Sequence, residues 1–96
     1  MDESTGPLTF AGSFSRDARF APTASELAAK FAQATGCAEA AVEDIRESVG
    51  RAFEAALTAD GAASIDLALR AVGESFAADL TCGARSHLHL EHPRTA

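Results

Sequence analysis

Hydrophobic and polar residues alternate in four stretches of the chain, and this period of two predicts β-strands with one buried face. The first stretch, residues 8–14, lies near the start of the chain. The other three follow one another near its end, separated by short turns with glycine, and predict an antiparallel meander. These three strands are expected at about residues 65–70, 76–82 and 87–91.

Two helices are predicted between the first and second strands, because apolar residues recur there in steps of three and four. The spacing of Thr23 and Glu26 predicts a capping box at the start of the first helix. Gly36 is expected to end it in a left-handed conformation. The second helix begins near Ala38 and is expected to end at residues 60–61. Its apolar stripe consists of Val42, Ile45, Val49, Ala52, Phe53, Ala56 and Leu57.

The order β-α-α-β-β-β predicts an α+β fold, a two-layer sandwich of an antiparallel sheet with two helices on one face. We expect one domain over residues 7–92, with loose termini at 1–6 and 93–96. Gly50, in the middle of the second helix, predicts close packing against a neighbouring element. The core is small, which favours an oligomer or a permanent partner.

Charge and composition narrow the classes of partner. The net charge is −6 and the chain has one lysine, so nucleic acid and anionic membrane are disfavoured as ligands. Neither an export signal nor an apolar stretch long enough for a bilayer is visible, which predicts a cytoplasmic protein. Cys37 and Cys82 have no metal-binding spacing and are expected to be reduced thiols.

The last predicted strand carries the only candidate metal ligands. His87, His89 and Glu91 are expected on one face because they are two residues apart. Their span of about 13 Å is too long for one ion without bending the strand. We therefore predict no metal site and interpret these residues as the solvent face of an edge strand.

The helix pattern VEDIRESVGRAFEAAL, residues 42–57, resembles the second long helix of the anti-sigma-factor serine kinases. That family belongs to the GHKL (Bergerat-fold, histidine kinase-like) ATPase superfamily. In it, a Glu of this helix activates a water and an Asn holds Mg²⁺ on ATP. Arg51 and Ala55 stand at those positions here. The resemblance implies a truncated Bergerat-like scaffold with no catalytic residues.

Two further parts of the family's nucleotide site have no clear counterpart. The adenine-binding motif D-x-G-x-G would begin at Cys82 in one alignment and at Asp79 in another, and neither restores the motif. The glycine box that wraps the phosphates is absent from the sequence. We therefore expect no bound cofactor and no enzymatic activity.

The resemblance implies a non-catalytic, protein-binding regulatory module in transcription regulation. A sigma factor or a STAS-type anti-anti-sigma protein is the expected partner. The alternative is a minimal ATP-binding serine kinase or ATPase of the same superfamily. The candidate partner-binding residues lie on the charged face of the second helix: Glu43, Glu47, Arg51 and Glu54.

A homodimer is a further expectation, because the first strand is predicted at an unpaired edge of the sheet. Its candidate contact residues are Leu8, Phe10 and Phe14.

Overall fold

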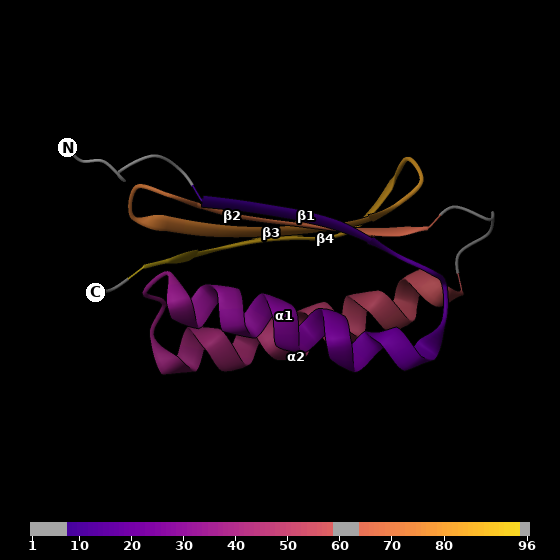
Figure 1. The fold of residues 1–96 in the computed structure, drawn as a ribbon, viewed down its shortest axis with the longest axis horizontal. Helices are drawn as coiled ribbons and strands as arrows, with labels where there is room; N and C mark the ends of the chain where they lie inside the picture. Colours follow the sequence, from indigo (N-terminus) through magenta and orange to yellow (C-terminus); the bar gives the residue numbers. More distant parts are fainter. Residues whose placement is uncertain (1–7, 59–63, 95–96) are drawn as a thin grey trace.

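A four-stranded antiparallel sheet forms one layer of the molecule and two long helices form the other, as predicted (Figure 1). The computed structural model describes residues 8–58 and 64–94. Within these ranges, no helix has an apolar stretch long enough to cross a bilayer. The elements are β1 (Leu8–Phe14), a short 3-10 turn η1 (Ala18–Phe20), α1 (Ala21–Ala34), α2 (Glu39–Leu57), β2 (Ile65–Val72), β3 (Ser75–Cys82) and β4 (Arg85–Pro93).

The strands lie in the sheet in the order β1-β2-β3-β4, so β1 and β4 are its two edges. The predicted edge position of the first strand is therefore confirmed. Both helices lie against the same face of the sheet (Figure 1). Among the described residues, no element covers the opposite face, which we call the open face.

The core fills the space between the sheet and the helices. The predicted alternation in β2 and β3 is confirmed, since every second residue of both strands is buried against the helices. The apolar stripe of α2 is also buried, apart from its half-buried last residue Leu57. The largest fully buried side chains are Phe53, Phe76, Ile45, Ile65, Leu67, Leu69, Leu80 and Val49.

Small residues form the contact between α1 and α2. Ala24, Ala28 and Ala32 of α1 are completely buried. Gly50 faces Ser25 of α1, as its position in mid-helix predicts. A Cβ atom at Gly50 would lie 3.7 Å from the Cβ of Ser25, which is an ordinary van der Waals distance.

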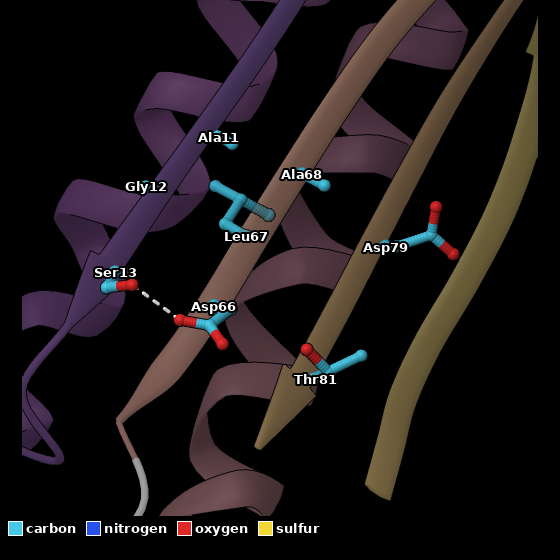
Figure 2. A pocket seen from close by; sticks show the side chains of 8 residues that line it. All are labelled: Ala11, Gly12, Ser13, Asp66, Leu67, Ala68, Asp79 and Thr81. Carbon is cyan, nitrogen blue, oxygen red and sulfur yellow. Dashed lines mark hydrogen bonds between the residues drawn. The ribbon is translucent and has the colours of Figure 1, made fainter. Parts of the chain in front are cut away.

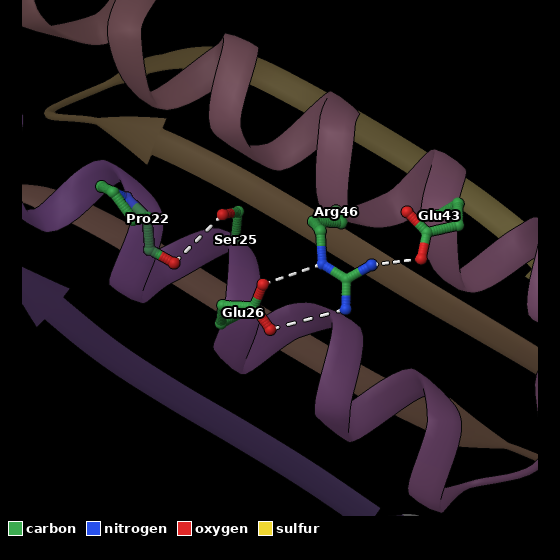
Figure 3. Close-up of polar contacts among 5 residues, drawn as sticks. All are labelled: Pro22, Ser25, Glu26, Glu43 and Arg46. Carbon is green, nitrogen blue, oxygen red and sulfur yellow. Dashed lines mark hydrogen bonds and ion pairs between the residues drawn. The ribbon is translucent and has the colours of Figure 1, made fainter.

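The predicted capping box is wrong, because α1 begins two residues before Thr23, at Ala21. Pro22 lies in the first turn of the helix, where its fixed φ angle favours helix initiation. The preceding turn η1 leads directly into α1. Glu26 bonds to Arg46 of α2, with 2.9 Å between Oε2 and Nε, so it holds the two helices together (Figure 3).

The predicted glycine end of α1 is confirmed, since Gly36 has a φ angle of 101°. The C-terminal strand continues further than predicted, and residues 93–94 are held rather than loose. Pro93 pairs with Ser75, and the Arg94 guanidinium donates to the carbonyl oxygens of Thr35 at 2.7 Å and Gly73 at 2.5 Å. The predicted loose residues 1–6, and the predicted end of the second helix at 60–61, lie outside the described residues.

Candidate functional site

A hollow between α2 and β4 is lined by Arg51 and Ala55. These are the two positions that align with the base and the metal ligand of the anti-sigma kinases. The hollow opens to solvent and has a volume of about 340 Å³. We call it the α2–β4 hollow. Arg51 and Ala55 lie one helical turn apart, so α2 presents both to the same hollow. Its lining residues are Ser48, Arg51, Ala52, Ala55, His87 and Leu88.

A β-bulge brings His87 into this hollow. Leu80 pairs with Leu88, but the next residue of β3, Thr81, pairs with Ser86, so His87 is the extra residue of β4. A bulge bends its strand and changes the direction of a side chain. His87 therefore lies against α2, whereas His89 lies on the open face of the sheet.

The prediction that His87, His89 and Glu91 share one face is consequently wrong. The period of two fails at the bulge, and His87 is separated from the other two side chains. The described part of the chain contains no group of three His, Cys, Asp or Glu residues that could hold a metal ion.

His87, which lines the α2–β4 hollow, has one buried ring nitrogen without a hydrogen-bond partner in the described part of the chain. Nε2 of His87 is inaccessible to solvent and has no hydrogen-bond partner among the described residues. A buried polar nitrogen without a partner destabilises a fold by about 1–3 kcal/mol. The Arg51 side chain beside it is 76% exposed, and its Nη2 lies 2.9 Å from a Glu47 carboxylate oxygen.

The charged residues predicted to bind a partner lie on the outer face of α2, and three of the four are in ion pairs. Glu47 and Arg51 form one pair. Glu43 accepts from Arg46, which also contacts Glu26 of α1 (Figure 3). The hydrogen bonds that the Arg46 guanidinium donates to the Glu43 and Glu26 carboxylates raise the pKa of Arg46. The fourth residue, Glu54, is exposed.

A second, shallow hollow of about 390 Å³ lies on the open face, across β1, β2 and β3 (Figure 2). The sequence analysis did not predict this hollow. The polar residues that alternate with buried ones in these three strands indicated a shared solvent-facing surface. Ser13 donates to a carboxylate oxygen of Asp66 at 2.5 Å. We call it the open-face hollow, and its lining residues are Ala11, Gly12, Ser13, Asp66, Leu67, Ala68, Asp79 and Thr81.

An acid–imidazole pair borders the open-face hollow. Nδ1 of His89 lies 2.5 Å from an Asp79 carboxylate oxygen, and Nε2 lies 3.5 Å from a Glu91 oxygen. The hydrogen bond to Asp79 and the charges of both carboxylates raise the pKa of His89. The imidazole is therefore held between two acceptors.

Neither Cys37 nor Cys82 is in a disulfide. Cys82, which one alignment places at the adenine-binding position, is buried in the core at the end of β3. Burial raises the pKa of the Cys37 thiol. A raised pKa keeps a thiol protonated and poorly nucleophilic at neutral pH.

Of the three side chains predicted to form the dimer edge, only the first is exposed. Leu8 is 55% exposed, whereas Phe10 and Phe14 are half-buried against the core. The Phe14 ring packs edge-on against Phe53 of α2, with 5.8 Å between the ring centroids. A second chain at this edge would therefore contact the β1 backbone more than these two rings.

Taken together, the fold and its hollows define a two-layer α+β domain with an open sheet face. No protein-family model, curated protein or solved structure matches this chain. Its function must therefore be inferred from its own geometry.

Proposed function

We propose that this chain is a non-catalytic, protein-binding regulatory module that acts in transcription regulation. The observation that carries the proposal is the lining of the α2–β4 hollow, where a guanidinium and a methyl group stand at the positions of the family's base and metal ligand. Mg²⁺ requires oxygen ligands, and phosphoryl transfer depends on positioned charge. Arg51 has the wrong sign to hold a metal ion.

The open face of the sheet is the surface that we assign to the partner. Its central residues are small, and the carboxylates of Asp66 and Asp79 line its hollow (Figure 2). A flat surface with a carboxylate-lined depression complements a protein that presents a lysine or arginine side chain. The net charge of −6 favours the same kind of partner.

The resemblance of α2 to the anti-sigma kinases supports a sigma factor or a STAS-type protein as this partner. Because these proteins act on transcription, a cytoplasmic location is part of the proposal. A homodimer through the exposed backbone of β1 is also part of it.

Calorimetric titration with ATP and Mg²⁺ tests the loss of nucleotide binding. We expect no binding heat and no shift of the melting temperature. Binding with a dissociation constant near 1 μM would support the alternative, a minimal ATPase, and would overturn the proposal.

Affinity capture from the native cell, followed by identification of the bound proteins, tests the partner. A sigma factor or a STAS-type protein should be captured directly by the purified chain. Capture of neither class would overturn the regulatory part of the proposal.

A matched pair of variants tests the assigned surface. Ala68→Arg places a long cation at the centre of the open face, whereas Ala40→Arg makes the same change on the exposed side of α2. We expect Ala68→Arg to weaken capture at least tenfold and Ala40→Arg to leave it unchanged. The reverse result would assign the partner to the helical layer. Light scattering at high protein concentration tests the dimer separately, and a monomer there would contradict it.

A further inference from the structure

The two edges of the sheet differ in how they are protected against pairing with another strand. At one edge, β4 carries charged side chains, ends in a proline and is interrupted by the bulge at His87. These features prevent the addition of a further strand. At the other edge, the sequence of β1 is LTFAGSF, without a charged residue or a proline, and its pairing with β2 is regular throughout. β1 therefore has none of the features that protect β4.

The sequence of β1 is complementary to itself in an antiparallel pair centred on Ala11. In that register, Thr9 of one copy lies opposite Ser13 of the other, so two hydroxyl side chains face each other on the open face. Leu8 lies opposite Phe14 of the second copy, which gives an apolar pair on the side of the helices. Pairs of these kinds, directly opposite one another, stabilise antiparallel strands.

Phe10 and Gly12 form the remaining pair, and their sizes are complementary. The Phe10 ring leans along its own strand over Gly12, since a Cβ atom at Gly12 would lie only 2.9 Å from the Cζ atom of Phe10. In the register centred on Ala11, Phe10 lies opposite Gly12 of the second copy. A large residue thus faces one without a side chain, and the two backbones can approach to the usual distance between strands.

The open-face hollow reaches the same edge of the sheet. Its β1 side consists of Ala11, Gly12 and Ser13 (Figure 2). A strand added to β1 would continue this face beyond the hollow. In the register centred on Ala11, the added strand places its Thr9 side chain beside Ser13, which donates to Asp66. The second copy would therefore supply a residue to the border of the hollow.

We propose that a second copy of this chain pairs antiparallel with β1 about a twofold axis at Ala11 and completes the open-face hollow with its Thr9 side chain. The two four-stranded sheets then form one continuous sheet with all the helices on one side. The two open faces become one surface with two carboxylate-lined hollows, which fits a partner with basic side chains at two places. This inference rests on the homodimer of the function proposed above, and it specifies the contact and its part in the partner surface.

Charge substitutions at the axis test the register. Ala11 is exposed, and Ala11→Lys or Ala11→Glu would each place two like charges opposite one another in the dimer. By sedimentation equilibrium, we expect each variant alone to dimerise several-fold more weakly than the original chain. An equimolar mixture of the two should favour the mixed dimer by roughly tenfold, because opposite charges then face each other.

Ala68 provides the matched control for these substitutions. It is exposed on the open face and pairs with Ala11, but it lies on β2, one strand further from the axis. We expect Ala68→Lys and Ala68→Glu to dimerise like the original chain, with no preference for a mixed dimer. Equal dimerisation of all four variants would place the contact elsewhere and refute the proposed register.

Isotope-filtered nuclear magnetic resonance on a mixture of ¹³C-labelled and unlabelled full chain tests the contact directly. We expect nuclear Overhauser effects between Thr9 of one copy and Ser13 of the other. A stable dimer without them would contradict this inference alone and leave the proposed homodimer in place. A monomer at high concentration would contradict both.

Discussion

Replacing Phe53 with alanine tests how the helical layer is held to the sheet. Phe53 is completely buried near the C-terminal end of α2. Its ring meets Phe14 of β1 edge-on, at 82° and with 5.8 Å between centroids. The Phe14 ring in turn lies 6.3 Å from the ring of Phe20. The three rings connect β1, η1 and α2.

The expected magnitude follows from this burial. A buried Phe→Ala substitution costs about 3–5 kcal/mol, because it removes apolar contacts and leaves a cavity. About 0.5–1.5 kcal/mol is expected as coupling between Phe53 and Phe14, since edge-on aromatic pairs contribute beyond their buried area. A domain of this size has a free energy of unfolding of about 5–15 kcal/mol. The melting temperature should therefore fall by about 12–40 °C.

Urea unfolding, followed by far-ultraviolet circular dichroism, measures the loss. Phe53→Leu is the matched control, because it keeps most of the buried volume and should cost less than about 1.5 kcal/mol. Phe20→Ala tests the least buried of the three rings, which is 36% exposed, and should cost about 1 kcal/mol. The Phe14→Ala, Phe53→Ala double-mutant cycle isolates the coupling. Equal losses in Phe53→Ala and Phe20→Ala would refute the reasoning.

Three other predictions concern single contacts. Arg94→Ala should lower the free energy of unfolding by about 1–3 kcal/mol, because it removes charged hydrogen bonds to the carbonyl oxygens of Thr35 and Gly73. Urea unfolding measures this loss, with Arg94→Lys as the comparison. If the lysine variant is as stable as the original chain, the role of the guanidinium fork is contradicted. Gly36→Ala should cost about 1–3 kcal/mol through backbone strain at φ 101°, and an unchanged urea midpoint would contradict it. Because the pKa of His89 is raised in the folded state, its pair with Asp79 stabilises the fold. This contribution is complete at pH values below the unfolded pKa of about 6.5, and it is lost as the pH rises through the higher folded pKa. A nuclear magnetic resonance titration should show His89 titrating at lower pH in Asp79→Asn, and identical curves would exclude the pair as the cause.

The fold was predictable because the hydrophobic residues recur with a period of two in the strands and with steps of three and four in the helices. Alternation in β2 and β3 and the stripe of α2 reflect burial on one face, which the structure confirms at Leu67, Leu80 and Val49. The start of α1 was not predictable from Thr23 and Glu26 alone. Glu26 was available as a capping residue, but its pairing with Arg46 depends on how the two helices pack.

The candidate site was predictable only on its helical side. The spacing of Arg51 and Ala55 places both on one side of α2, and both line the same hollow. The contribution of His87 depends on the extra residue between the pairs Leu80–Leu88 and Thr81–Ser86. Such a bulge is set by pairing between strands, and a period read along one strand does not reveal it.

The edge position of β1 has a consequence for how the sheet forms and opens. Strands β2, β3 and β4 are joined by short turns, whereas β1 pairs with β2 across about 50 residues of intervening chain. Closing that long loop costs more chain entropy than closing the short turns, and this cost slows the pairing of β1 with β2. We therefore expect β1 to be the last strand to dock. It should also be the first to detach, with amide hydrogens that exchange faster than those of β3. Each detachment would transfer the free edge of the sheet from β1 to β2.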